Sequence, residues 1–332
     1  QRLRPCECYV YRQCLLLLLS RTDMVVLIAV SSGDVASYHQ AECLLAMGDW
    51  EDLPDVEQQR ACARHQVRMW WLPDGCLRED HLDLRWQQAT GEVVDEVIFP
   101  SRHSAASGQA SLTLHPIGVM QLGKDEHPPY GGKAGDCPPP SPRLGPWWRE
   151  LLKHGSELDD FSLSLETTHH GPWLKSPSLF IEIGSTEDTW DHMGAAELLA
   201  GIIWRGLGLE DGILPALWPG EGVVVVTLGG GHYAPRANKL AAIPGVWLGH
   251  MLANYALPFE APEVEGETPL GNWSQSISAA ISSTREAFPG GQLVATLERK
   301  SFKAWQRNAI IEYLASLDVP VVRTKDIEAM LQ

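Results

Sequence analysis

The chain has 332 residues, 44% of them hydrophobic and 20% charged, and its formal net charge is −16 at pH 7. A chain of this length can form one large α/β domain or two smaller ones with ample core. The acidic balance argues against a general nucleic-acid binder, whose phosphate contacts need a basic surface, but it leaves room for a small basic patch.

The first 23 residues differ in composition from the rest of the chain. Arginine outnumbers the acidic residues there, and the leucine run at residues 15–19 is far too short to span a bilayer. Two interpretations stay open: a remnant of an organelle-targeting peptide, or sequence that is not native and precedes a true start at Met24, which we favour. We expect residues 1–23 to be a leader that is disordered or not native, and residues 24–332 to form one domain.

The seven cysteines show no paired metal-binding spacing beyond Cys6-x-Cys8. An odd number of thiols in a long chain favours a reduced intracellular protein, and we expect a cytoplasmic one. No segment after the leader is predicted to cross a membrane.

Strand and helix patterns alternate along the chain. The apolar patterns predict strands, in chain order, at residues 25–30, 93–99, 111–115, 161–167, 179–183, 223–226 and 319–322, and helices at residues 36–47, 147–154 and 302–317. A further helix is expected from the capping-box pattern at residues 185–188, because apolar residues follow it at three- and four-residue steps. Residues 121–142 and 258–268 indicate irregular loops. The alternation predicts an α/β fold with a single mixed or mostly parallel sheet flanked by helices.

The loop after the strand at residues 223–226 is the most informative stretch of the sequence. It reads Gly229-Gly230-Gly231-His232-Tyr233-Ala234-Pro235-Arg236. Glycine tolerates positive φ and the close approach of a ligand, so such a run is costly unless the backbone must bend or approach something. We expect the loop to offer a candidate general base and backbone N–H groups for a phosphate or a developing oxyanion. The alternative is a turn whose histidine faces the solvent.

Two further predicted strands also deliver polar residues to their ends. His169 and His170 follow one of them; in a strand only one of the two would enter a given site, whereas in a loop both could. Glu182 lies inside an apolar strand, where we expect it to be paired, to bind a metal or to orient a histidine. Ligands in open α/β sheets bind beyond the carboxyl ends of the strands, so these loops are candidates for one site. Purely structural hydrogen bonds and ion pairs stay open as alternatives.

His103 and His115 lie in the first half of the chain. Histidines together with carboxylates suggest zinc, which prefers imidazole nitrogen and oxygen ligands. No His-x-x-x-His or Cys-x-x-Cys spacing is present, so this expectation depends on residue types alone.

Lys300, Lys303 and Arg307 cluster near the last predicted helix. A solvated helix face is the usual explanation for such a cluster. The alternative is that this cluster, together with Arg236 and Lys239, forms a basic patch that binds a phosphate backbone.

These motifs resemble those of the D-aminoacyl-tRNA deacylases of the archaeal and plant type. The resemblance is carried, in family order, by Ser101-Arg102-His103-Ser104, Leu112-Thr113-Leu114-His115, Tyr130-Gly131-Gly132-Lys133, Thr168-His169-His170-Gly171-Pro172, Phe180-Ile181-Glu182-Ile183-Gly184-Ser185-Thr186-Glu187 and the glycine-rich loop ending at Arg236. It runs from about Met24 to the C-terminus.

The resemblance implies hydrolysis of the ester between a D-amino acid and the terminal ribose of tRNA, and in plants also removal of aldehyde-modified D-aminoacyl adducts. It further implies zinc as the cofactor and a fold similar to peptidyl-tRNA hydrolase and nucleoside phosphorylases. The expected protein is a monomer that binds D-aminoacyl-tRNA, with no obligate protein partner and no membrane attachment.

The resemblance and the residue types together give an expected site. The expected catalytic residues are His232, His169, His170 and Glu182. The expected substrate-binding residues are Gly229, Gly230, Gly231, Tyr233, Arg236, Arg102 and Lys300. The expected metal ligands are His103, His115, His170 and Glu182.

Two other functions stay open at this point. One is a zinc-assisted hydrolase of small amides or nucleosides, whose rate would depend little on salt. The other is a non-enzymatic module that binds tRNA or phosphate through a degenerate site.

Overall fold

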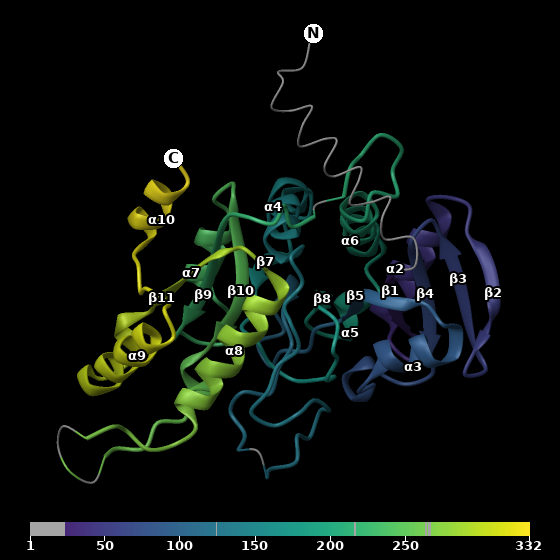
Figure 1. Ribbon diagram of the computed structural model, residues 1–332. Coiled ribbons are helices and arrows are strands. Elements are labelled where there is room, and N and C mark those ends of the chain that lie inside the picture. The colour runs from purple at the N-terminus through teal and green to yellow at the C-terminus, as the bar shows by residue number, and fades with distance from the viewer. Residues whose placement is uncertain (1–23, 124, 216, 263, 265–266) are drawn as a thin grey trace.

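The structure is a computed structural model, which describes residues 24–332 apart from residues 124, 216, 263, 265 and 266 (Figure 1). The expected leader at residues 1–23 lies outside the described residues. Within the described part, no helix is long and apolar enough to cross a membrane.

The described residues form alternating strands and helices. The strands are β1 (Met24–Ser31), β2 (Glu51–Val56), β3 (Gln59–Arg64), β4 (Val67–Leu72), β5 (Val93–Arg102), β6 (Ser111–His115), β7 (Ser162–Leu165), β8 (Ser178–Gly184), β9 (Val223–Leu228), β10 (Val246–Leu252) and β11 (Gln292–Leu297). The helices are α2 (Val35–Ala46), α3 (Leu82–Thr90), α4 (Leu144–His154), α5 (Glu187–Trp190), α6 (Met193–Gly206), α7 (Pro235–Ala241), α8 (Trp273–Ala287), α9 (Ala304–Ser316) and α10 (Thr324–Met330). Short 3-10 turns are η1 (Cys76–Arg78), η2 (Gly155–Glu157), η3 (Asn254–Ala256) and η4 (Arg299–Ser301).

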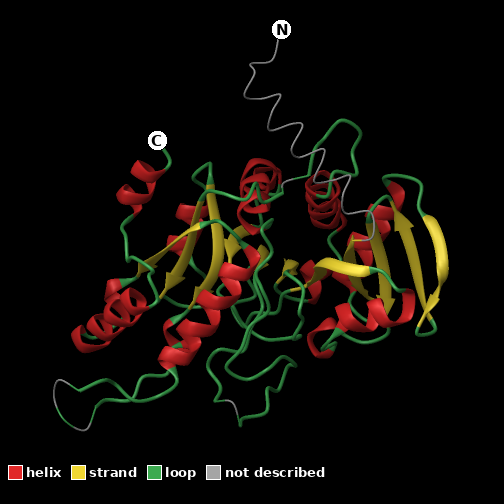
Figure 2. Ribbon diagram, viewed as in Figure 1, coloured by secondary structure: helices red, strands yellow, loops and turns green. Residues whose placement is uncertain are grey.

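The strands form two sheets (Figure 2). The larger has the order β2-β3-β4-β1-β5-β8-β6-β7; β4, β1, β5 and β8 run parallel, and β6 is antiparallel to β8. The smaller, β10-β9-β11, is wholly parallel. The expected α/β class with mostly parallel strands and flanking helices is confirmed. The expectation of a single sheet is wrong, because β9 pairs with β10 and β11 instead of extending the larger sheet from β7.

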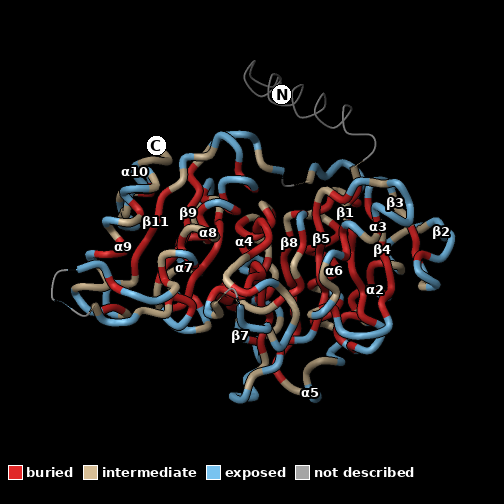
Figure 3. The backbone as a smooth tube through the Cα atoms, turned by 60° about the horizontal axis from the view of Figure 1, so that its bottom comes forward, coloured by how far each residue is buried: buried red, intermediate tan, exposed pale blue. Residues whose placement is uncertain are grey.

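Helices cover both faces of each sheet, which explains the uninterrupted apolar runs in the sequence. In β1, Ile28 and Val30 share a core cluster with residues of α2 and α6, whereas Leu27 and Ala29 share one with residues of α3. This alternation is the two-residue period of a strand. In the smaller sheet, α8 and α9 lie on one face of β9 and α7 and α10 on the other. Figure 3 shows buried residues along the strands of both sheets.

Most of the predicted strands and helices occur at the predicted residues. The strands at residues 25–30, 93–99, 111–115, 179–183 and 223–226 are β1, β5, β6, β8 and β9, and the helices at residues 36–47, 147–154 and 302–317 are α2, α4 and α9. The strand predicted at residues 161–167 is shorter, because its last two residues leave the sheet after β7. Residues 121–142 contain no helix or strand among those described, as expected.

Two predictions differ from the structure. The strand expected at residues 319–322 is wrong: only Val321 makes an isolated bridge, to Ala295, because Pro320 has no N–H for a ladder. The capping box at Thr186 starts only the short α5, with Thr189 as its second member. The apolar stripe belongs to α6, where the Nδ1 of His192 accepts from the N–H of Ala195 at 3.1 Å.

One segment, residues 166–170, joins the two sheets and is called the bridging segment below. The N–H of Glu166 donates to the carbonyl of Leu114 in β6 at 3.0 Å. Two residues later, the N–H of Thr168 donates to the carbonyl of Met251 in β10 at 2.7 Å. The bridging segment therefore fixes the carboxyl end of β6 relative to the smaller sheet.

His250, in β10, supports the bridging segment from the interior. Its Nε2 lies 3.1 Å from the carbonyl oxygen of Pro138, which can only accept, so this nitrogen carries the hydrogen. Its Nδ1 therefore accepts from the hydroxyl of Thr168 at 3.0 Å. Burial of the ring lowers the pKa of His250 to about 4. The neutral imidazole is thus the form that the fold holds.

The free energy of unfolding should depend on pH through His250. Its folded-state pKa lies below the unfolded value of 6.5, so its contribution is complete above pH 6.5 and is lost as the pH falls toward 4. We expect a loss of about 1.4 kcal/mol per pH unit across this window. Urea unfolding of the wild type and of His250→Gln, at a series of pH values from about 7 to about 4, isolates this slope. Parallel curves for the two proteins would contradict it.

Candidate functional site

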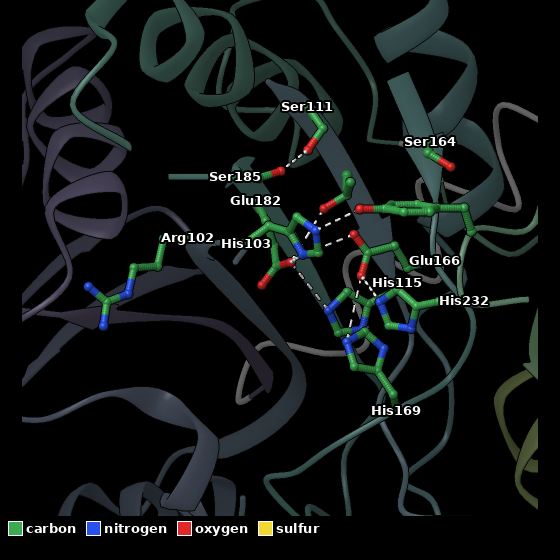
Figure 4. A network of polar contacts seen from close by, with 12 residues as sticks. Arg102, His103, Ser111, His115, Ser164, Glu166, His169, Glu182, Ser185 and His232 are labelled. Atoms are coloured by element: carbon green, nitrogen blue, oxygen red, sulfur yellow. Dashed lines mark hydrogen bonds and ion pairs between the residues drawn. The ribbon is translucent and has the colours of Figure 1, made fainter. Parts of the chain in front are cut away.

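Neighbouring strands bring polar side chains to one face of the larger sheet. Glu182 of β8 pairs in register with Ser101 of β5 and with Thr113 of β6. Residues paired across strands point to the same face, and so do residues two positions further along a strand. His103 follows Ser101 and His115 follows Thr113 at this spacing. The strands therefore direct both histidines toward Glu182 (Figure 4).

Glu182 is a buried carboxylate with four polar neighbours. The hydroxyl of Ser101 donates to Oε1 at 2.7 Å and that of Thr113 to Oε2 at 3.3 Å. His103 Nδ1 and His115 Nε2 each lie 3.6 Å from Oε2. Burial alone would raise the pKa of Glu182, but its contacts with His103 and His115 outweigh burial and hold the pKa well below its usual range. Glu182 is therefore a buried anion with hydroxyl and histidine neighbours, which is one of the arrangements expected for a carboxylate in an apolar strand.

A second buried carboxylate, Glu166, lies between two histidines, and no sequence motif predicted it. Its side chain is 0% exposed. Oε1 lies 3.1 Å from His103 Nδ1, and Oε2 accepts from His232 Nε2 at 2.9 Å. His169 Nε2 is 3.6 Å from the same Oε2. In the sequence, Glu166 could be recognised only as a single acidic residue at the end of an apolar strand, three residues before His169.

The shared contacts with the two carboxylates set the charge of His103. Burial lowers the pKa of His103, but the hydrogen bond to Glu182 and the negative charges of Glu166 and Glu182 outweigh burial, so the net shift is upward. The same balance raises the pKa of His115, where Glu182 again outweighs burial. Positive charge at these two rings is thus favoured by the carboxylates beside them.

Both His169 and His170 enter the site, because the bridging segment is a loop and not a strand. His170 has a φ of 40°, in the left-handed region, which turns the chain between the two side chains. The ring centroids of His169 and His170 lie 4.1 Å and 4.9 Å from that of His115. The alternative that only one of them enters is therefore wrong.

Three histidines, His115, His169 and His170, can each offer one ring nitrogen to a shared space. Nδ1 of His115, His169 and His170 faces a backbone carbonyl oxygen, at 3.1, 2.7 and 2.6 Å respectively. A carbonyl oxygen only accepts, so Nδ1 carries the hydrogen in each ring, and Nε2 has a lone pair whenever the ring is neutral. The three rings can offer ligand atoms that lie within 4.8 Å of one another.

The environment also keeps two of these rings neutral. Burial holds the pKa of His169 well below its usual range, and the neighbouring histidines lower it further. Burial likewise lowers the pKa of His170 to about 3. Converging lone pairs repel one another unless a cation lies between them, and His115 Nε2 is buried without a hydrogen-bond partner. Neutral imidazoles oriented by carbonyl oxygens, as in His169 and His170, suit a metal ion, which would replace the proton on His115.

The metal ligands expected from the sequence do not form one group. His115 and His170 gather with His169, whereas His103 and Glu182 gather with Glu166. A third group consists of Glu166, His169 and His232. These groups share members, so the residues form one continuous cluster of histidines and carboxylates.

His232 is the member of the cluster most open to solvent, with its side chain 35% exposed. Its Nδ1 lies 3.0 Å from the hydroxyl of Tyr255, which is also 3.3 Å from Thr167 Oγ1. Tyr255, in η3, was missed by the sequence analysis because no pattern distinguished it. Tyr233 is 39% exposed, and its hydroxyl lies 3.1 Å from His103 Nε2. The two tyrosines thus flank His232 at the rim of the site.

The glycine run shapes the backbone that carries His232. Gly229 has a φ of 96°, and a Cβ there would lie 2.7 Å from the ring of Phe302. Its N–H donates to the carbonyl of Leu252 at 2.7 Å. The N–H of Gly230 donates to Ser301 Oγ at 2.8 Å. Of the three glycines, Gly231 is the exposed one next to His232.

The three basic residues expected to bind substrate lie outside the cluster. Arg236 forms an ion pair with Glu298 at 3.1 Å. Arg102 points away from the histidines, and its guanidinium lies over the ring of Trp190 at 4.7 Å (Figure 4). Lys300 is exposed in η4.

Loss of a donor to Glu182 should destabilise the fold. In Ser101→Ala, the buried Oε1 of Glu182 loses its 2.7 Å hydrogen bond, so we expect the free energy of unfolding to fall by about 1–3 kcal/mol. Urea denaturation measures this change. Ser156→Ala is the matched control, since Ser156 is exposed, and it should stay within about 0.5 kcal/mol of the wild type. Equal effects of the two substitutions would show that the contact with Glu182 is unimportant.

The chain is similar in sequence to known proteins of one family. A sequence model of the family D-aminoacyl-tRNA deacylase matches residues 90–322. The chain is 45% identical over 316 residues to a D-aminoacyl-tRNA deacylase of Arabidopsis thaliana, covering 91% of this chain and 99% of that protein. A D-aminoacyl-tRNA deacylase of Methanococcoides burtonii is 28% identical over 317 residues, and the match covers 92% of this chain but 58% of that protein.

The fold also matches a solved structure. A crystal structure of a conserved protein of unknown function superposes with a TM-score of 0.74 at 24% sequence identity, covering 92% of this chain and 97% of the other. The family match includes all of the histidines and carboxylates of the cluster, and the Arabidopsis relative is covered almost completely. The chain therefore belongs to the D-aminoacyl-tRNA deacylase family.

Proposed function

We propose that the protein hydrolyses the ester bond that joins a D-amino acid to the terminal ribose of tRNA. Membership of the deacylase family supports this reaction. The observation that carries the proposal is the pair of buried Glu166 and half-exposed His232, which are 2.9 Å apart beside three converging histidines. Ester hydrolysis needs a base for water and a group that stabilises the tetrahedral oxyanion, and this cluster holds candidates for both.

His232 is the general base of the proposed mechanism. Its Nε2–H donates to Glu166, so Nδ1 is the basic atom, on the side that Tyr255 contacts. Water replaces the hydroxyl of Tyr255 at Nδ1 and gives its proton to this nitrogen as its oxygen attacks the carbonyl carbon of the ester. Glu166 stabilises the imidazolium that forms. When the tetrahedral intermediate collapses, the ribose oxygen leaves and takes the proton back from His232.

His115, His169 and His170 fit zinc, and we assign them as its ligands. Their donors are imidazole nitrogens, and each ring is oriented by a backbone carbonyl oxygen on its other side. Glu182, next to His115, favours the positive charge that a metal ion would bring. When bound, zinc supplies a Lewis acid that polarises the ester carbonyl.

Residues at the rim would contact the substrate. Tyr233 and Tyr255 expose aromatic surface on either side of His232, and Gly231 is exposed next to it. The N–H of Gly230 already donates to Ser301, so Gly231 is the better candidate for an oxyanion contact. Aromatic side chains stack on bases of single-stranded nucleic acid, which suits a terminal adenosine.

We further propose a monomer that works in the cytoplasm. The cysteines of the described residues, Cys43, Cys62, Cys76 and Cys137, are all buried and unpaired. Burial raises the pKa of the Cys62 thiol to about 11 and that of the Cys137 thiol to about 12, so both are protonated and unreactive at neutral pH. Unpaired thiols suit a reducing compartment.

The proposal is tested with matched D-tyrosyl-tRNA and L-tyrosyl-tRNA, each with and without a metal chelator. We expect rapid loss of the D ester alone, abolished by the chelator and restored by zinc. Release of free amino acid measures the rate. D-selective loss that ignores the chelator would keep the reaction and remove the metal from it. If neither ester is lost faster than its spontaneous rate, the proposal fails and a small-substrate hydrolase takes its place.

A further inference from the structure

The segment that follows β11 and includes the first turn of α9 carries an unusual local charge. Residues 299–307, called the basic segment below, contain Arg299, Lys300, Lys303 and Arg307 and no acidic residue, in a chain whose net charge is −16. Across the described part of the chain, none of these four side chains forms an ion pair. Arg299, Lys300 and Lys303 are exposed. Their charges are therefore available to an external anion.

The fold places the basic segment beside the active site. β11 pairs with β9 in parallel, with Leu297 opposite Leu228, so the chain leaves both strands at the carboxyl-terminal end of the sheet. Immediately beyond this end, Ser301 Oγ accepts from the N–H of Gly230 at 2.8 Å. His232 follows two residues after Gly230. The basic segment is thus attached to the loop that carries the proposed general base.

Internal contacts hold the basic segment in shape and leave its charges unopposed. The guanidinium of Arg307 donates to the carbonyl oxygens of Phe302 at 2.6 Å and Arg299 at 3.2 Å, which closes the turn. The acidic residue just before the segment, Glu298, is occupied by Arg236 at 3.1 Å. Arg236 is therefore a local counter-ion, and the exposed cations of the basic segment remain for a ligand.

We propose that the basic segment binds the phosphodiester groups at the single-stranded 3′ end of the tRNA substrate. This inference rests on the proposed deacylase function. The scissile ester is on the terminal ribose, so the last phosphodiesters of the strand must lie close to His232. Lysine and arginine position a nucleic acid through its phosphates without reading its sequence. An acidic protein that acts on tRNA needs a local surface of this kind beside its site.

The test compares two substrates that carry the same ester. D-tyrosyl-tRNA has the phosphodiester backbone, whereas the D-tyrosyl ester of adenosine has none. For the double variant Lys300→Ala and Lys303→Ala, we expect the ratio of kcat/KM for the tRNA to kcat/KM for the nucleoside ester to fall about tenfold or more at low salt, mainly through KM. Lys325→Ala is the matched control, because Lys325 is exposed on α10, which packs at the amino ends of β9 and β10. It should leave the ratio at its wild-type value.

Binding of uncharged tRNA gives a second readout that does not depend on catalysis. We expect the log–log dependence of affinity on salt to become shallower by roughly 0.7 for each phosphate contact that the double variant loses. An unchanged salt slope together with an unchanged kcat/KM ratio would overturn the inference. If the wild type hydrolyses neither ester, the proposed function fails, and the salt slope alone decides whether the basic segment binds tRNA.

Discussion

Two buried carboxylates, Glu166 and Glu182, govern the arrangement of the site. A buried charge without partners costs several kcal/mol, so each carboxylate requires donors or cations around it. Hydroxyl groups and histidines from β5 and β6 surround Glu182, and histidines from both sheets surround Glu166. His103 lies between the two carboxylates and is held in a state that favours positive charge. The two sheets therefore meet around one cluster of paired charges, and His232 is its most open member.

The fold could be predicted where one physical signal dominated. Apolar runs buried on both faces, as in β1 and β9, and periodic helices such as α2 were evident from the sequence. β2 was not, because it is largely exposed and contains Pro54, which strands disfavour. α8 was missed because its serine-rich sequence is a weak helix former, and tertiary packing against the smaller sheet stabilises it instead. The division into two sheets depends on strand pairing between distant residues, which no local pattern encodes.

Most residues of the site were predicted from the sequence, but the contacts between them were not. Motifs at strand ends indicated that His169, His170, Glu182 and His232 would lie in one site, and all four lie in the cluster. His103 and His115 were expected only from their residue type. Glu166 was overlooked because a single acid after a strand looks like any loop residue until the bridging segment is placed between the sheets. Arg236 was expected to hold substrate, but its proximity to Glu298 arises only when β9 and β11 lie side by side.

The central claim is that Glu166 supports His232 as the base that activates water. Measuring kcat and KM of Glu166→Gln on D-tyrosyl-tRNA tests this most directly, because glutamine keeps the size of the side chain and removes its charge. We expect kcat to fall by about 100-fold or more with KM changed little, while Glu187→Gln, an exposed control, stays at the wild-type value. A folded Glu166→Gln protein, verified by circular dichroism, with kcat within about twofold of the wild type would contradict the account.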